Sequence, residues 1–216
     1  MNKIREGIGR FQRDVFPQRR TMFEKLAIGQ QPRALFLTCA DSRIDPSLIT
    51  QTDPGDLFIC RNAGNIVPPH SSMTGGMTAS IEYAVAALNV PHLIVCGHSH
   101  CGAMAALMHP ESTAGLPHTN NWLSYAQAAV QVVEALYPQA SEEDRLQALI
   151  EHNVLVQLQN LRTHPHVAAR LATSRIQLHG WIYMIESGEV LAFDEASRQF
   201  RPLLESPLPE AAPQIA

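Results

Sequence analysis

The 216-residue sequence predicts an α/β fold built on a mostly parallel sheet. The main observation is a series of short, nearly continuous apolar runs, which are typical of strands buried on both faces of such a sheet. Three of these runs lie at residues 34–39, 56–60 and 92–96. Apolar residues at helical spacing follow between and after the runs, and this alternation of strands and helices indicates the fold class.

The C-terminal part adds a fourth parallel strand and one antiparallel edge strand. Residues 176–185 form the next apolar run, and Ser187-Gly188 predicts a hairpin turn into residues 190–193. We therefore expect about four parallel strands and one antiparallel edge strand, flanked by helices.

Residues 1–30 are predicted to form an N-terminal helical arm. Apolar residues recur there at spacings of four, three and four, which places them on one helix face: Ile4, Ile8, Phe11 and Val15. Pro17 should break this helix, and a second short helix should end near Gly29. The core of this chain or a second subunit must cover the apolar face.

Further helices are expected at residues 73–88, 103–108, 122–136 and 141–161, with a short one through 171. Ser141 precedes three acidic residues and is the expected N-cap of its helix. The sequence is Pro-rich from Pro202 and should be loosely held there. The chain is thus predicted to be one domain, residues 1–216, with an arm at 1–30 and a tail at 202–216.

Composition and charge exclude several classes of partner. The formal net charge is −4 without a run of Lys or Arg, so nucleic acid and anionic membranes are not expected partners. No apolar stretch reaches the length of a membrane span, and the first residues do not form a secretory signal. Four cysteines without an export signal favour a reducing environment, and we expect a cytoplasmic protein.

Two thiols and one imidazole are the most informative residues. Cys39 ends the first predicted strand, and His98 and Cys101 follow the third. Ligands of α/β sheets bind outside the carboxyl ends of the strands, so neighbouring first and third strands would bring the three together. The set suits zinc and leaves a fourth position where water can become hydroxide. Cys60 and Cys96 lie inside strand patterns and are interpreted as core residues.

Asp41 and Arg43 lie just beyond Cys39. A carboxylate beside zinc could accept a hydrogen bond from zinc-bound hydroxide, while the fork of the guanidinium holds it in place. Asp41 could instead bind the metal directly and close the site. The pair could also be a surface ion pair of little consequence.

Together these residues resemble the β-class carbonic anhydrases. The pattern Cys-x-Asp-x-Arg from Cys39 and the pattern His-x-x-Cys from His98 carry the resemblance. It continues in Pro54-Gly55-Asp56-Leu57-Phe58, Arg61-Asn62-Ala63-Gly64-Asn65, Ile81-Glu82-Tyr83-Ala84 and His179-Gly180-Trp181. It covers roughly residues 11–200, and within the family the chain looks most similar to the bacterial cyanate-inducible carbonic anhydrases.

The resemblance implies reversible hydration of CO₂ to bicarbonate and a proton. Zinc would be the cofactor on Cys39, His98 and Cys101, with Asp41 and Arg43 as the catalytic pair. The positions that match substrate-contacting residues are Gln30, Phe58, Tyr83 and the backbone amide of Gly102. Outside the resemblance, Phe58 and Tyr83 could be plain core residues and Gln30 an exposed loop residue. The family forms dimers and multiples of them, so at least a dimer is expected, with the N-terminal helices reaching across.

One departure concerns the state of the site. Phe36 stands three residues before Cys39, where the subgroup with a closed, bicarbonate-inhibited site carries Trp. Arg61 is present, but the non-catalytic bicarbonate pocket is incomplete, so we expect the open form with Asp41 on Arg43. Two thiolates donate more charge than imidazoles, so activity should rise above neutral pH. A histidine should shuttle the proton, and ten histidines leave that residue unassigned.

Three other functions stay open. The same site could act on a CO₂ analogue such as carbon disulfide, which direct assay of both substrates would separate. A fully ligated zinc could be structural in a binding protein, in which case Asp41→Ala would loosen the metal without loss of turnover. The thiols could be redox-active, although the sequence has no Cys-x-x-Cys pair.

Overall fold

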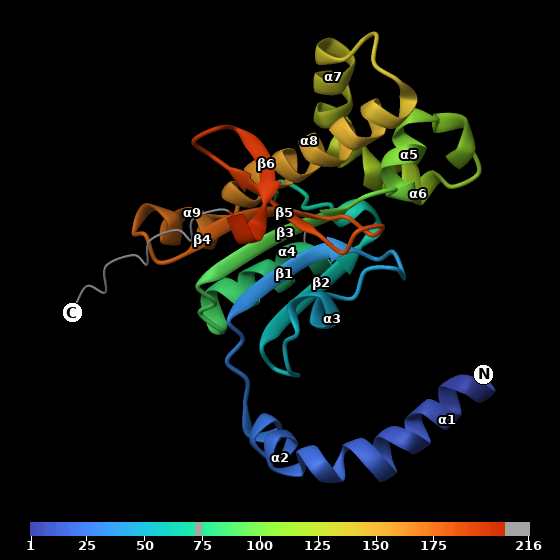
Figure 1. The fold of residues 1–216 in the computed structure, drawn as a ribbon. Coiled ribbons are helices and arrows are strands. Elements are labelled where there is room, and N and C mark those ends of the chain that lie inside the picture. Colours follow the sequence, from blue (N-terminus) through green and yellow to red (C-terminus); the bar gives the residue numbers. More distant parts are fainter. Residues whose placement is uncertain (72–74, 206–216) are drawn as a thin grey trace. The chain divides into compact units, whose positions relative to one another are not determined.

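The computed structural model describes residues 1–71 and 75–205 (Figure 1). It divides into a helical unit, Met1–Gln31, and a larger unit that begins at Pro32. The predicted start of one helix at Met73 and most of the predicted tail, residues 206–216, lie outside the described residues.

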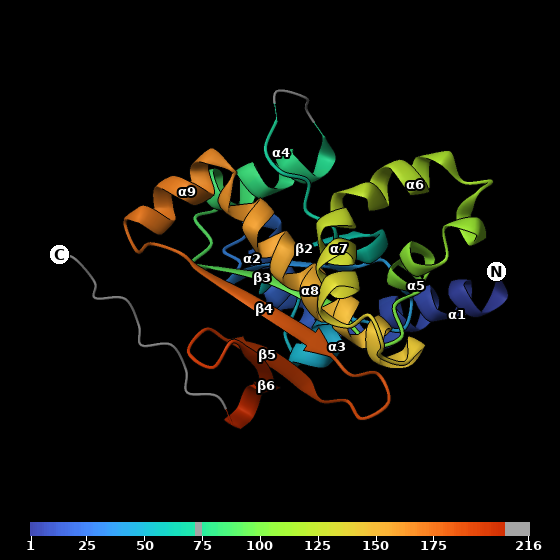
Figure 2. The ribbon, with the colours of Figure 1, turned by 90° about the horizontal axis from the view of Figure 1, so that it is seen from above.

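The larger unit is built on a six-stranded sheet with the order β2-β1-β3-β4-β5-β6, whose strands are labelled in Figure 1. Figure 2 shows β4, β5 and β6 of this sheet from above. The first four strands in this order are parallel, as predicted, and β5 and β6 are antiparallel. The strands are β1 (Ala34–Cys39), β2 (Leu57–Asn62), β3 (His92–His98), β4 (Gln177–Tyr183), β5 (Val190–Asp194) and β6 (Gln199–Pro202).

The antiparallel edge holds two strands where the sequence predicted one. In β6, Phe200 pairs with Phe193 of β5, and the two ring centroids lie 5.4 Å apart. This strand escapes prediction because it is only four residues long and half of it is exposed. Residues 202–205, assigned to a loose tail, instead complete β6 and a short 3₁₀ turn, Leu203–Glu205.

Burial separates the central strands from the edge. All six residues of β1 are buried, and so are six of the seven residues of β3. The prediction that β2 is buried on both faces is wrong, because β2 lies at the edge of the sheet, where alternate side chains face solvent. The central position of β1 and β3 fixes the strand ends that carry the predicted ligands.

A core lies on each face of the sheet. On one face α8 packs against β3 and β4, and α4 adds apolar side chains. On the other face Phe36, Ile94 and Cys96 form a smaller core that Ile49 of α3 partly covers. The helices of this unit are α3 (Pro46–Thr50), α4 (Gly76–Glu82), α5 (Gly102–Met108), α6 (Pro117–Leu123), α7 (Gln127–Leu136), α8 (Glu142–Arg162) and α9 (Pro165–Ala172).

Helix boundaries follow the sequence in part. Ser141 caps α8, because its hydroxyl accepts from the backbone N–H of Asp144, as predicted. The helix expected at residues 122–136 is interrupted by a 3₁₀ turn, Ser124–Ala126, where the Ser124 hydroxyl donates to the Asn121 carbonyl. The helix expected to end at residue 88 is α4, followed by a π-helical turn, Tyr83–Ala87.

The helical unit consists of α1 (Asn2–Arg10) and α2 (Arg20–Ile28) with short turns between them. Pro17 does not break the chain's helical path, because it occupies the first position of a 3₁₀ turn, where no backbone donor is needed. The predicted apolar stripe is exposed within this unit: Ile4, Ile8, Phe11 and Val15.

Candidate metal centre

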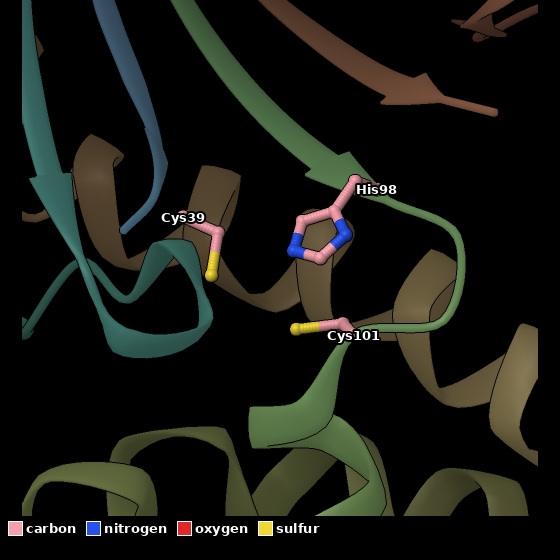
Figure 3. Close-up of side chains that lie close together, drawn as sticks. All are labelled: Cys39, His98 and Cys101. Carbon is pink, nitrogen blue, oxygen red and sulfur yellow. The ribbon is translucent and has the colours of Figure 1, made fainter. Parts of the chain in front are cut away.

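The carboxyl ends of β1 and β3 bring the three predicted ligands together. Cys39 is the last residue of β1 and His98 the last of β3, and the two strands are parallel neighbours. Cys101 is the N-cap of α5, which begins immediately after the loop from His98. The ligand atoms of the three residues all lie within 4.8 Å of one another, and all three residues are buried (Figure 3).

The imidazole of His98 is oriented by its own loop. Its Nδ1 donates to the backbone carbonyl of Ser99 over 2.9 Å, which leaves Nε2 as the atom that faces the thiols. This Nε2 is buried and has no hydrogen-bond partner among the residues that the structure describes. A buried, unpartnered nitrogen beside two sulfur atoms fits a zinc ion, for which imidazole and thiolate are preferred ligands.

The two thiols differ in their electrostatic surroundings. The adjacent thiol of Cys101, the imidazole of His98 and the backbone N–H of Gly64 lower the pKa of Cys39, against the opposing effect of burial. The same contact with Cys39 raises the pKa of Cys101, and burial adds to this rise. The N–H of Gly64 lies 3.4 Å from Sγ of Cys39. The centre therefore already stabilises one thiolate.

Asp41 and Arg43 form a bidentate pair at this centre. Nε of Arg43 lies 2.9 Å from Oδ1 of Asp41, and a terminal nitrogen lies 2.7 Å from Oδ2. Arg43 also donates to the carbonyl of His100 over 3.0 Å, which ties the pair to the ligand loop. Hydrogen bonds from Arg43 hold the pKa of Asp41 well below its usual range. Oδ2 of Asp41 lies 3.9 Å from Nε2 of His98, so a permanently charged carboxylate borders the ligands.

Comparison with known proteins identifies this arrangement. The family model described as carbonic anhydrase matches residues 34–190. The chain belongs to the carbonic anhydrase family. A carbonic anhydrase of Pseudomonas aeruginosa is 51% identical over 207 residues, which are 96% of this chain and 94% of the relative.

Solved structures place the chain in the β class. The structure of the β-carbonic anhydrase CcaA has a TM-score of 0.92 and 44% identity, and the match covers 98% of this chain and 93% of that one. Tetrameric β-carbonic anhydrases of Sordaria macrospora match with a TM-score of 0.70 and 31% identity over 88% of this chain and 92% of theirs. No helix in the described ranges, 1–71 and 75–205, is long and apolar enough to cross a membrane.

Arg61 of this carbonic anhydrase holds the loop between Cys39 and Ile44. Its guanidinium donates to the carbonyls of Cys39, Asp41 and Ile44 at 3.0, 2.6 and 2.9 Å. No local sequence pattern predicts this role of Arg61, because the contact depends on the pairing of β2 with β1. All three bonds fix the backbone that carries Cys39 and Asp41.

Ser99 is a second residue that sequence reasoning missed. Its hydroxyl donates to Glu186 over 2.6 Å and accepts from the backbone N–H of Ile185 over 2.9 Å. Its backbone N–H donates to the carbonyl of Tyr183. These bonds attach the ligand loop to the turn after β4. Only its place beside His98 in the sequence could have drawn attention to it.

The predicted substrate-contacting residues are not all at the centre. Gly102 is the first residue of α5 and is exposed, with open space where a side chain would lie. The rings of Phe58 and Tyr83 lie 6.0 Å apart, and Tyr83 is 50% exposed. Phe58 pairs with Leu35, four residues before Cys39, which places it about 13 Å back along the sheet.

Gln30 belongs to the helical unit and is exposed there. Within one chain, the structure therefore brings together the three ligands, the Asp41–Arg43 pair and Gly102. It does not bring Phe58 to the ligands of its own chain.

Proposed function

We propose that this carbonic anhydrase hydrates CO₂ reversibly to bicarbonate and a proton, with zinc on Cys39, His98 and Cys101. The observation that supports this most is the convergence of two thiols and an unpartnered imidazole nitrogen next to a charged carboxylate. Zinc bound there would supply a hydroxide near neutral pH for attack on the carbon of CO₂.

Asp41 and Arg43 would orient the attacking oxygen. Arg43 keeps Asp41 ionised and fixed by two charge-assisted hydrogen bonds, so the carboxylate can only accept. A fixed acceptor selects one orientation of the nucleophile's O–H and turns its lone pair toward the substrate. The interpretation of this pair as an inconsequential surface ion pair does not account for its link to the carbonyl of His100.

Gly102 would stabilise the charge that develops on the substrate. Its backbone N–H lies in the first turn of α5, where donors have no partner within the helix. Such a donor, aimed at an oxygen that becomes negative during attack, favours the transition state over CO₂ itself. The open space at Gly102 leaves room for a small substrate.

A second copy of the chain would complete the apolar pocket with Phe58, Tyr83 and Gln30. The register of β2 separates Phe58 from the ligands of its own chain, and Tyr83 exposes half of its surface. The exposed stripe on the helical unit needs a cover, and the related Sordaria macrospora enzymes are tetramers. We propose a dimer or a multiple of dimers.

Light scattering on the full chain and on a chain that lacks residues 1–29 tests the assembly. The full chain should be at least dimeric, and the truncated chain should be unstable or insoluble. A well-folded, fully active monomer from the truncation would contradict the proposal.

Stopped-flow CO₂ hydration, with zinc measured on the same sample, tests the activity. We expect about one zinc per chain and rapid hydration. Bound zinc without hydration would favour a structural metal, and turnover of carbon disulfide but not CO₂ would favour the analogue as substrate.

A further inference from the structure

A buried row of amide side chains on α8 faces the turn that follows β2. Asn153 and Gln157 are 1% and 0% exposed. They are linked to each other, because Nε2 of Gln157 donates to Oδ1 of Asn153 over 2.8 Å. Asn160, which is only partly buried, continues the row and donates to Oε1 of Gln157. Three connected amides in an otherwise apolar interface are costly to bury, so their partners identify what they do.

The partners are backbone atoms of residues 64–67. Nδ2 of Asn153 donates to the carbonyl of Gly64 over 3.0 Å. The backbone N–H of Val67 donates to Oε1 of Gln157 over 2.8 Å, and Asn160 donates to the carbonyl of Val67 over 2.9 Å. The row therefore fixes both ends of this short segment from a helix about 90 residues away in the sequence.

Gly64 connects this row to the metal centre. Its carbonyl accepts from Asn153, while its N–H donates to Sγ of Cys39. Gly64 has φ +78°, and a Cβ there would lie 3.0 Å from Met104 and 3.2 Å from Ala103, which lie three and two residues after Cys101. One residue thus contacts a ligand thiol on one strand and the helix that carries the other.

We propose that Asn153, supported by Gln157, is a positioning residue that aims the N–H of Gly64 at the thiolate of Cys39. A hydrogen bond to a ligand sulfur orients the ligand and tunes the charge that it donates to a metal. The inference rests on the proposed zinc site, and it assigns to α8 a part in metal binding although no α8 side chain is a ligand. Asn153 touches neither metal nor substrate and acts only through Gly64.

Asn153→Leu and Asn160→Leu form a matched pair for the test. Each variant replaces an amide of α8 with an apolar residue and leaves one backbone carbonyl of the segment unpartnered, at Gly64 or at Val67. Both should lower the melting temperature. Only Asn153→Leu should disturb Cys39. Gln159→Leu, on the exposed face of α8, controls for the change in surface.

The readout is metal binding by the full chain. Zinc affinity is measured by chelator competition, and the near-ultraviolet thiolate-to-metal band is recorded after replacement of zinc by Co²⁺. We expect Asn153→Leu to bind zinc about 10- to 100-fold more weakly, with an altered band, and Asn160→Leu to match the wild type in both.

Unchanged affinity and band in Asn153→Leu would overturn the proposal, and so would equal changes in both variants. If Asn153→Leu does not fold, Gln157→Leu replaces it and is expected to change the band in the same direction. A wild-type chain that binds no zinc would contradict the proposed function instead, so the two failures are distinguishable.

Discussion

Strand β3 begins and ends with a histidine, and the two ends differ in what surrounds the imidazole. At the carboxyl end, His98 faces two thiols and a carboxylate. At the amino end, the imidazole of His92 faces another imidazole, with its Nδ1 3.1 Å from Nε2 of His179. Each imidazole makes one hydrogen bond, but His98 is fully buried whereas His92 is only partly buried. Full burial beside two thiols and a carboxylate therefore distinguishes the imidazole of the metal centre from that of a structural contact.

The largest expected effect comes from substituting each of these two histidines, His98 and His92, separately with glutamine. His98→Gln should lose zinc affinity by more than ~100-fold, because changes merely behind a ligand already cost 10- to 100-fold. Hydration should fall in parallel. His92→Gln is the matched control and should keep zinc and activity. The measurement is zinc content and stopped-flow hydration, and a zinc-loaded, active His98→Gln would end the distinction between the two ends.

The second-largest expected effect concerns the carboxylate of Asp41, which lies beside His98. Asp41→Asn should retain zinc but lower kcat by about 100-fold, because the amide no longer forms the charge-assisted fork with Arg43 and the nucleophile is misoriented. Asp45→Asn, at the N-cap of α3, is the control, because Asn caps a helix as well as Asp does. Full activity in Asp41→Asn would remove Asp41 from the catalytic account.

The third prediction compares two glycines with a positive φ angle, Gly64 and Gly188. Gly64→Ala should lower the free energy of unfolding by about 1–3 kcal/mol, from backbone strain and from contact with Met104 and Ala103. It should also weaken zinc binding. Gly188 also has a positive φ, +75°, but a Cβ added there would have no atom within 4 Å. Gly188→Ala should therefore show the backbone cost alone and keep its zinc affinity. Urea unfolding and chelator competition measure both, and equal zinc affinity in the two variants would contradict the role of Gly64.

The smallest expected effect is a pH dependence of stability that arises at His179, which contacts His92 at the amino end of β3. Burial, with a lesser contribution from His92, lowers the pKa of His179 to about 4. Its unfolded value is about 6.5, so the unfolded state takes up the proton first, and stability falls as the pH drops from about 6.5 towards 4. Between pH 7 and 5 the wild type should lose about 1 kcal/mol more than His179→Gln in urea unfolding, since partial exposure reduces the effect. Identical losses in both chains would show that His179 is protonated as readily in the folded state.

Features of the fold and of the metal centre that depend on local sequence pattern could be predicted. Apolar runs predict β1 and β3, and the chemistry of Cys39, His98 and Cys101 predicts the centre once those strands are neighbours. The helix cap at Ser141 is likewise a local signal.

Other features depend on contacts that no local pattern contains. The hydrogen bonds of Arg61 require β2 to pair with β1, and that of Asn153 spans 89 positions to Gly64. The position of Phe58 away from Cys39 follows from strand register. An amide in a helix or an aromatic residue in a strand looks the same in sequence whether it serves the site or only the core.

The cysteines allow the most direct test. Cys96 lies within β3 and Cys60 within β2, and neither belongs to the group of ligand atoms formed by Cys39, His98 and Cys101. X-ray absorption at the zinc edge counts the sulfur ligands of the loaded enzyme. We expect two sulfur ligands at about 2.3 Å, retained in Cys96→Ala and reduced to one in Cys39→Ser. A zinc ion with only nitrogen and oxygen ligands, or one that is unchanged in Cys39→Ser, would contradict it.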